Sequence, residues 1–143
     1  MRRSTVLSAF AAAAFPFSTA GVSLAADPPA AAGSEAAAEI VGREVAAYNA
    51  HDAATVTNLH GPNAALTLLP YGKILASGSE QLLALFTKSF KDFPGVTLTL
   101  EKQFVLKNVV VNHYTVTGGS RSEILSIYDV QNGVIANEWV ILG

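Results

Sequence analysis

Glu138 is the residue that the sequence places best for moving a proton. It lies in the alternating segment from Val134 to Leu142. Alternate side chains of a strand share a face, which groups Glu138 with four apolar residues: Val134, Ala136, Val140 and Leu142. A carboxylate among apolar groups is hard to ionise, and such a group can act as a general acid or base near neutral pH. The alternative is a half-exposed glutamate that pairs with a lysine or arginine.

Glu44 is the second carboxylate of interest. It lies on a predicted helix whose apolar stripe, at steps of three and four, consists of Ala37, Val41, Val45 and Tyr48. Glu44 shares this stripe only in part, so a solvated helix face next to Arg43 is the alternative. If both glutamates enter one cavity, they form a carboxylate pair whose two ionisations are separated.

The three histidines are spread along the chain without the short spacing of a metal site. His113 is adjacent to Tyr114, so these two side chains point to opposite faces of a strand and only one can face a cavity. His60, at the end of a predicted helix, is more typical of a packing residue than of a base. His51 lies beside a helix cap, where we expect it to be exposed.

Tyr128 could offer its hydroxyl to a ligand. It shares a strand face with Ile124, Ser126 and Val130. Trp139 lies on the opposite face from Glu138, where it would pack outside the sheet or in a dimer interface. Core packing is the alternative for all the aromatic residues. The sequence has no nucleophile elbow, phosphate loop or dinucleotide fingerprint, and it predicts neither a cofactor nor a metal.

The first 25 residues are typical of a secretory signal peptide. Arg2 and Arg3 precede an apolar run from Val6 to Phe17, and Ser23-Leu24-Ala25 offers small residues at a cleavage site. Residues 26–34 are rich in Pro, Ala and Gly and predict a flexible tether. We therefore expect an exported protein, periplasmic or secreted, with one domain over residues 35–143.

The expected mature chain is acidic. It has seven basic and eleven acidic residues. No basic surface is offered to phosphates, so nucleic acid is not an expected partner. The chain has no cysteine, which excludes disulfides and thiolate chemistry. After signal cleavage we expect no membrane association, and stability must come from the core and from dimerisation.

Helices dominate the first half of the domain and strands the second. One helix is predicted from Ser34 to about Ala50, a second from the Asp52 cap to Gly61-Pro62-Asn63, and a third from a capping box at Ser77-Gly78-Ser79-Glu80 to Phe93-Pro94-Gly95. Strands are predicted at residues 65–69, 96–101, 109–117, 123–130 and 134–142, with a hairpin at Asn132-Gly133. Short turns between consecutive strands predict an antiparallel sheet, and helices on one face of it give an α+β class.

Several of these segments together resemble one known superfamily. They are Tyr48-Asn49-Ala50-His51-Asp52, the strand from Leu66 to Pro70, Gly78, Phe93-Pro94 and Asn132-Gly133-Val134-Ile135. From about Ala38 to Leu142 the chain is similar to the nuclear transport factor 2-like superfamily, in its SnoaL-like branch. The resemblance implies a cone-shaped curved antiparallel sheet wrapped around a long N-terminal helix, a homodimer and an apolar pocket. It also turns the Glu138 face of the last strand toward that pocket.

The residues that the ketosteroid isomerases of this superfamily use do not carry over to this chain. Their proton-moving carboxylate precedes a proline, where this chain has Leu68-Leu69-Pro70, and leucine cannot accept a proton. The isomerase tyrosine on the first helix corresponds to Glu44, and the second acid falls near Ser126. Val140 stands where some relatives have an aspartate after the tryptophan. The sequence therefore argues against a ketosteroid isomerase of the usual kind.

Three functions remain open. The first is a binding module for a small apolar molecule in the pocket of the cone. The second is a cofactor-free isomerase, cyclase or lyase, in which Glu138 works with Tyr128 or His113. The third is a mainly structural dimerisation module, with a pocket filled by side chains. The expected catalytic candidates are Glu138, Glu44 and His113, and the expected ligand contacts are Tyr48, Tyr128, Ser126, Leu69 and Val140.

Overall fold

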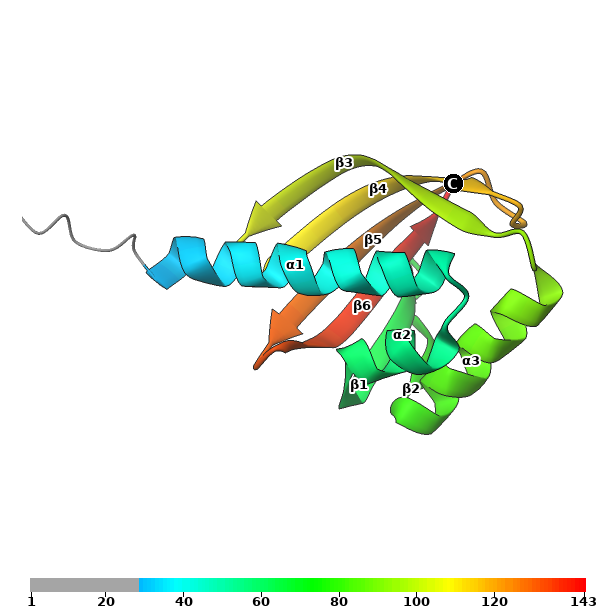
Figure 1. Ribbon diagram of the computed structural model, residues 1–143, viewed down its shortest axis with the longest axis horizontal. Coiled ribbons are helices and arrows are strands. Elements are labelled where there is room, and N and C mark those ends of the chain that lie inside the picture. Colours follow the sequence, from blue (N-terminus) through cyan, green and yellow to red (C-terminus); the bar gives the residue numbers. More distant parts are fainter. Residues whose placement is uncertain (1–28) are drawn as a thin grey trace, which may run out of the picture.

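A curved six-stranded sheet arches over one long helix (Figure 1). The computed structural model describes residues 29–143, with side chains from residue 33 onward. The expected signal peptide and its cleavage site lie outside the described residues. None of the described helices combines the length and apolar character needed to cross a membrane. The architecture is the α+β cone that the sequence predicts.

Three helices accompany the sheet. They are α1 (Pro29–Asn49), α2 (Ala53–Leu59) and α3 (Ser79–Asp92). Helix α1 begins at Pro29, inside the segment predicted as a tether, instead of at Ser34. The physical reason is local, since alanine has the highest helix propensity and proline is tolerated in the first helical turn. Helices α2 and α3 pack beside each other, next to the first two strands of the chain (Figure 1).

The strands are β1 (His60–Leu69), β2 (Lys73–Ser77), β3 (Thr97–Leu106), β4 (Val109–Thr117), β5 (Glu123–Gln131) and β6 (Val134–Leu142). Strands β4 and β6 have the predicted bounds. Strand β1 starts at His60, so Gly61-Pro62-Asn63, which was predicted to end the second helix, lies within a strand and the helix ends earlier, at Leu59. Strand β2 was not predicted, because four of its five residues are exposed and it carries little apolar alternation.

The strand order is β2-β1-β6-β5-β4-β3. Four neighbouring pairs are antiparallel. The prediction of a fully antiparallel sheet is wrong at one pair, because β1 and β6 run parallel. No hairpin joins these two strands, so turn geometry does not set their direction. The parallel pair places the first strand of the domain beside its last strand.

The start of α3 differs from the predicted capping box. The N-cap is Gly78, whose φ of +82° places it in the left-handed region, where glycine has no steric cost. Ser77 ends β2 and cannot also serve as the cap. Its backbone N–H instead donates to the Gln81 side chain at 3.0 Å. The cap is therefore shifted by one residue from the predicted position.

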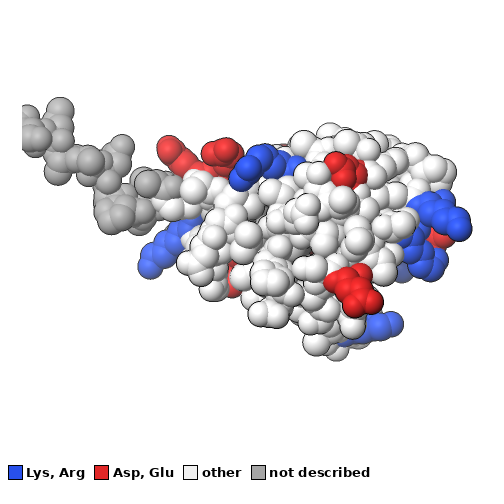
Figure 2. Space-filling model, turned by 60° about the horizontal axis from the view of Figure 1, so that its bottom comes forward, with Lys and Arg blue, Asp and Glu red and all other residues white. Residues whose placement is uncertain are grey.

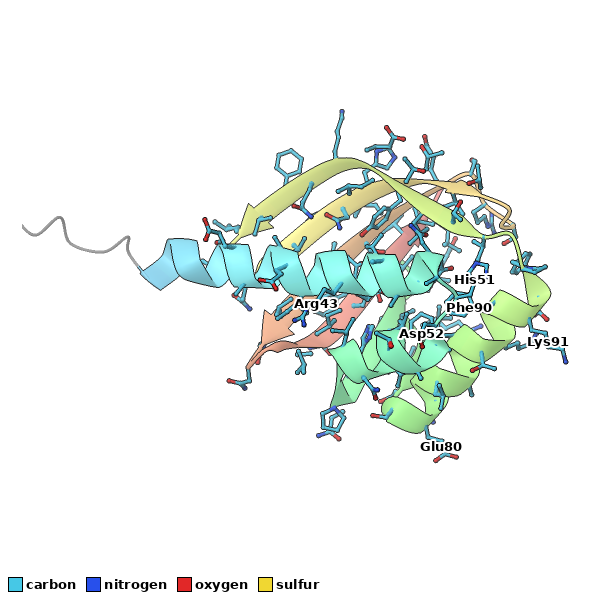
Figure 3. All side chains as sticks on the ribbon, in the orientation of Figure 1. Arg43, His51, Asp52, Glu80, Phe90 and Lys91 are labelled. Carbon is cyan, nitrogen blue, oxygen red and sulfur yellow. The ribbon has the colours of Figure 1, made fainter. Side chains whose placement is uncertain are left out.

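The motif Tyr48-Asn49-Ala50-His51-Asp52 joins α1 to its surroundings, as the sequence suggested. The Asn49 amide exchanges two hydrogen bonds with the Leu98 backbone, at 2.8 and 2.9 Å. Asp52 caps α2 by accepting from the Thr55 backbone N–H at 3.0 Å. His51 is half-buried and not exposed as predicted, because its ring stacks on Phe90 with centroids 5.0 Å apart (Figure 3). This junction fixes the C-terminal end of α1 against β3.

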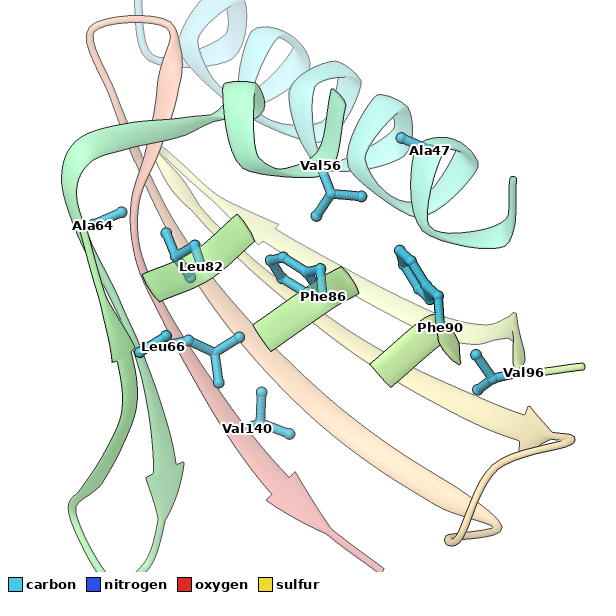
Figure 4. Close-up of a cluster of buried hydrophobic side chains, with 10 residues drawn as sticks. Ala47, Val56, Ala64, Leu66, Leu82, Phe86, Phe90, Val96 and Val140 are labelled. Atoms are coloured by element: carbon cyan, nitrogen blue, oxygen red, sulfur yellow. The ribbon is translucent and has the colours of Figure 1, made fainter. Parts of the chain in front are cut away.

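Two apolar clusters fill the concave side of the sheet. One lies between α2, α3 and β1, and Figure 4 shows Leu82, Phe86 and Phe90 of α3 at its centre. The other lies between α1 and the strands β4 to β6 and includes Val41, Tyr128 and Ile135. On the face drawn in Figure 2, charged side chains are scattered among uncharged ones. The buried polar residues described next lie beside these two clusters.

Candidate active site

A cavity of about 240 Å³ opens on the concave side of the sheet. Its walls come from α1, α3 and the strands β1, β2, β3, β4, β5 and β6. Most of the lining is apolar, and two carboxyl groups, Glu44 and Glu138, reach it from different elements. Both are buried, with 2% and 5% of their surface exposed. An apolar pocket with a few convergent polar groups is the usual form of a small-molecule site.

Glu44 lies in the middle of the buried stripe of α1. The stripe consists of Ala37, Ile40, Val41, Glu44 and Ala47. The alternative of a solvated helix face at Glu44 is therefore wrong. Glu44 is spaced by three residues from Val41 and from Ala47, so it belongs to the face of the helix that packs against the sheet. The predicted members Val45 and Tyr48 lie at the edge of this face and are only half-buried.

Glu138 is directed into the cavity by β6, but not with all the neighbours predicted. The pairing of β5 with β6 skips Ala136, since Asp129 pairs with Asn137 and Val130 with Ile135. Such a bulge changes which residues share a face. Ile135 is consequently fully buried, while Val134 and Ala136 are not. Past the bulge, Glu138 pairs across the strands with Tyr128.

His60 faces Glu138 from β1. Its Nδ1 lies 2.8 Å from the Val56 carbonyl oxygen, and a carbonyl only accepts, so Nδ1 carries a proton. Its Nε2 lies 3.5 Å from Glu138 Oε2. Neither of these two atoms has a hydrogen-bond partner among the described residues. A favourable contact between them needs one shared proton, held either by His60 as an imidazolium or by Glu138 as a neutral acid.

A chain of hydroxyl and amide donors ends at Glu44. Asn112 Nδ2 donates to the Tyr114 hydroxyl at 2.5 Å, and this hydroxyl lies 3.2 Å from the Tyr128 hydroxyl. Tyr128 in turn donates to Glu44 Oε2 at 3.4 Å. Because Asn112 donates at one end and Glu44 accepts at the other, the hydroxyls in between are oriented in one direction. All four side chains are buried.

Burial controls the ionisation of these groups. Desolvation, then the nearby Glu138 carboxylate, raises the pKa of Glu44 from 4.5 to about 8. Burial alone would lower the pKa of His60, but Glu138, the Val56 carbonyl and Glu44 outweigh it and leave the pKa above 6.5. Desolvation and the two glutamates raise the pKa of Tyr48 to about 12. Glu44 and Tyr48 therefore carry protons at neutral pH.

The two other tyrosines of the cluster are also held protonated. Burial, followed by the charges of Glu44 and Glu138, raises the pKa of Tyr128 well above its ordinary value. Burial also raises the pKa of Tyr114, although its hydrogen bonds with Tyr128 and Asn112 lower it. Both hydroxyls thus remain hydrogen-bond donors throughout the neutral pH range.

The structure brings most of the predicted site residues to the cavity. Those that line it are Glu44, Tyr48, Ser126, Tyr128, Glu138 and Val140. Leu69 does not, because the alternation of β1 turns Leu66 inward and Leu69 to the other face. His113 does not either, because Tyr114 takes the inward position on β4. The His113 ring lies outside, 3.8 Å from Glu123.

Three residues of the cluster were not predicted as functional. His60 was interpreted as a packing residue, and its contact with Glu138 depends on the parallel pairing of β1 and β6. Asn112 and Tyr114 alternate with Val110 on the buried face of β4. The sequence signal for them is this period of two, which puts residues 110, 112 and 114 on one face of the strand but does not say which face is buried. Among the described residues, no group of three or more His, Cys, Asp or Glu residues could hold a metal ion.

Comparisons with known proteins agree on the fold. Residues 41–138 match the SnoaL-like domain family. An uncharacterised cystatin-fold protein from Novosphingobium aromaticivorans superimposes with a TM-score of 0.67 and 18% identity, covering 73% of this chain and 97% of that one. A comparison with curated protein sequences finds no match.

Several of the similar solved structures have descriptions that mention an activity. A putative ketosteroid isomerase from Kribbella flavida has a TM-score of 0.67 and 12% identity, over 77% of this chain and 79% of that one. IdmH, a putative polyketide cyclase from Streptomyces antibioticus, has a TM-score of 0.62 and 18% identity, over 74% and 91%. At these identities the similarity establishes the fold alone.

Proposed function

The chain belongs to the SnoaL-like domain family, and from this premise we propose that its cavity binds a small, mostly apolar carbonyl compound and moves a proton on it without a cofactor. One observation carries the proposal. The buried carboxyl group of Glu138 lines the cavity, and its Oε2 lies 3.5 Å from His60 Nε2. Neither Glu138 Oε2 nor His60 Nε2 has a hydrogen-bond partner among the described residues. Unused polar atoms beside an apolar cavity are typical of a site that completes its contacts with a ligand.

The proposed reaction begins at a C–H bond next to the substrate carbonyl. Glu138, as a carboxylate, accepts the proton, and the electron pair of the broken C–H bond moves into the carbonyl to give an enolate. Where a C=C bond of the substrate is conjugated with the enolate, return of the proton to the far carbon of that bond moves the double bond and isomerises the substrate. Attack of the enolate carbon on a second carbonyl group, with protonation of the new alkoxide, would close a ring.

Glu44 supplies the donor for the enolate oxygen. It carries a proton at neutral pH, because burial raises its pKa to about 8. Tyr128, the cross-strand partner of Glu138, donates its own proton to Glu44 Oε2 and so orients the Glu44 carboxyl group on the cavity wall. Donors that are already oriented in a dry site stabilise a developing negative charge without reorganisation.

His60 acts as a positioning residue in this scheme. Its Nδ1 proton is committed to the Val56 carbonyl, which fixes the ring and leaves Nε2 directed at Glu138. This nitrogen can hold the shared proton while Glu138 stays ionised. It does not line the cavity, so it affects the substrate only through Glu138.

A second candidate function is binding without catalysis. It is favoured by the mostly apolar lining of the cavity. The third possibility, a structural module with a filled pocket, fits poorly because a cavity of about 240 Å³ is present.

We also propose that the outer face of the sheet forms a homodimer interface. Ile141 is 40% exposed there, and Trp139 is half-buried on the same strand. Large apolar side chains on an exposed sheet face favour association. Sedimentation equilibrium at micromolar concentration checks this proposal, and a monomer of wild-type protein would contradict it.

Proton transfer can be tested with a probe ketone, 2-tetralone, whose C1 protons exchange with deuterium in D2O. We expect wild-type protein to accelerate the exchange and Glu138→Gln to lower the rate to that of buffer. Glu39→Gln is the matched control, since Glu39 is exposed on α1, outside the cavity lining. If 2-tetralone shifts the amide resonances of cavity residues but exchanges no faster than in buffer, the catalytic proposal is wrong and the binding candidate stands.

A further inference from the structure

We propose that the natural ligand is an apolar carboxylate whose anionic group binds Arg121 at the mouth of the cavity. This inference rests on the proposed function, because it describes the ligand of the same cavity. It adds a charge, a position for that charge and an orientation of the ligand, none of which follows from proton transfer alone.

Arg121 is the cationic residue among the described residues that line the cavity. It is exposed, and it lies at the rim together with the partly exposed side chains of Leu75, Phe93 and Leu142. The ion pairs of the described residues join other side chains, and Arg121 takes part in none of them. Its guanidinium group therefore has all its donors available to a carboxylate, for which its planar shape is suited.

The turn that carries Arg121 is held in place on the rim. Gly118 has a φ of +68°, and a Cβ atom there would lie 2.1 Å from the Gly95 carbonyl oxygen. The β4–β5 turn thus packs directly on the backbone that links α3 to β3. The Val116 N–H also donates to the Ser122 carbonyl at 2.8 Å and closes the turn from within. Arg121 is consequently attached to a fixed edge of the cavity.

The inner end of the cavity disfavours an anion. Glu44 and Glu138 are the acidic residues of the lining. Glu44 is protonated at neutral pH, so a ligand carboxylate at this end would face the like charge of the Glu138 carboxylate in a dry environment. The nearby Glu123 is turned outward, 3.8 Å from His113, and does not line the cavity. The walls between the two ends are apolar, with Phe86, Val96 and Val116 among them. An amphiphilic ligand therefore enters with its uncharged end first.

The volume limits the size of the ligand. A cavity of about 240 Å³ lies below the roughly 300–1,000 Å³ of pockets that bury drug-sized molecules. One or two rings, or a short chain, would fill it and leave the carboxylate at the rim. Naphthalene-2-carboxylate has this size and shape, and naphthalene-2-carboxamide is its uncharged counterpart.

The test compares these two probes by isothermal titration calorimetry at low salt. We expect wild-type protein to bind the carboxylate roughly threefold to tenfold more tightly than the amide, as for a charge-assisted contact at an exposed site. Arg121→Gln should remove the preference while leaving the affinity for the amide unchanged. Added salt should weaken the preference, because the rim is open to solvent.

Arg43→Gln is the matched control. It makes the same change of side chain and of net charge on an exposed residue of α1 that lies outside the cavity lining (Figure 3), so it should keep the preference. Equal binding of both probes by wild-type protein, or a preference that survives in Arg121→Gln, would overturn the carboxylate proposal alone. If neither probe binds while 2-tetralone exchange is accelerated, the carboxylate proposal fails and the proposed function stands.

Discussion

The two buried carboxyl groups of this protein have different surroundings. Glu44, on α1, accepts the end of a donor chain that runs through Tyr128 and Tyr114 to Asn112. Glu138, on β6, faces a single histidine nitrogen at 3.5 Å, and neither atom has a hydrogen-bond partner among the described residues. We call these the closed end and the open end of the polar cluster.

The difference in hydrogen-bond partners between Glu44 and Glu138 suggests that one group serves mainly the stability of the fold and the other mainly the proposed activity. At the closed end, the Glu44 carboxyl group and both tyrosine hydroxyls have hydrogen-bond partners, and only Asn112 Oδ1 lacks one among the described residues. Paired polar groups in a low-dielectric interior specify a structure, and an unpaired group costs free energy until something contacts it. The closed end should therefore contribute mainly to stability and to orienting hydroxyl donors. The open end retains capacity for a substrate and for a proton. The following predictions, from the largest effect to the smallest, test this division.

The largest expected effect is on proton exchange at the open end. Glu138→Gln should slow deuterium exchange of 2-tetralone by roughly 10²–10⁴-fold, the usual contribution of a general base. Glu44→Gln should keep the rate within about tenfold, because an amide can still donate a hydrogen bond to an enolate oxygen. Initial exchange rates of the wild-type protein and of the two variants, measured by proton NMR, test this difference. A larger loss in Glu44→Gln than in Glu138→Gln would reverse the assignment of the two ends.

The second effect is the pH dependence of stability that the closed end produces. The pKa of Glu44 is raised by burial from 4.5 to about 8, so folding favours the protonated acid. The free energy of unfolding should be highest below pH 4.5 and fall as the pH rises from there through 8, by on the order of 5 kcal/mol at most. Urea denaturation between pH 4.5 and 8.5 measures the slope.

Glu44→Gln should remove most of this slope, because the amide does not ionise. A smaller fall of the same sign should remain, since the pKa of His60 is also raised and its contribution is likewise lost at high pH. Glu39→Gln, on the exposed face of the same helix, should retain the wild-type slope. An unchanged slope in Glu44→Gln would show that another group produces it.

The third prediction compares the stability cost of one substitution at each end. Tyr128→Phe leaves Glu44 without its donor and Tyr114 without its neighbouring hydroxyl, and should cost about 1–3 kcal/mol. Glu138→Gln should cost less than about 1 kcal/mol, because the amide can donate to His60 Nε2 and has nearly the same shape. Urea midpoints at pH 7 provide the comparison. Equal costs would contradict the division into closed and open ends.

The smallest effect concerns a carboxylate outside the cluster. The pKa of Asp52 is lowered from 3.8 by hydrogen bonds from the Thr55 side chain and backbone. Its contribution to stability is therefore present above pH 3.8 and is lost as the pH falls, opposite in sign to that of Glu44. Asp52→Ala should lower the urea midpoint at pH 7 and less so at pH 3. Altered 2-tetralone exchange in this variant would show that the open end is not independent of the α2 cap.

Local pattern was enough to predict much of the fold. Strands β4 and β6 were predicted with their observed bounds, because alternation and turn residues mark them directly. Strand β2 was missed because it is short, mostly exposed and held by pairing with β1. The start of α1 was placed too late, since a Pro-, Ala- and Gly-rich segment suits both a tether and a first helical turn.

The candidate site was predicted in part. Glu138, Tyr128 and Ser126 reach the cavity from the strand faces that alternation assigned to them. Leu69 was assigned to the cavity because the ketosteroid isomerases have their proton-moving carboxylate at this place. In the structure, Leu66 is the residue of β1 whose side chain lines the cavity, and Leu69 lies on the other face of the strand. The bulge at Ala136 could not be read from the sequence, because residues 134–136 are all apolar and give no alternation that would mark the extra residue.

By itself, the sequence determined which residue types were available and which helices and strands could form, since both depend on neighbours in the chain. Only the tertiary structure decided which of them meet. The parallel pairing of β1 with β6 brings His60 to Glu138, and the packing of α1 under the sheet buries Glu44 beside Tyr128. The physical reason is that ionisation and hydrogen bonding depend on desolvation and distance across elements, and no local periodicity specifies either.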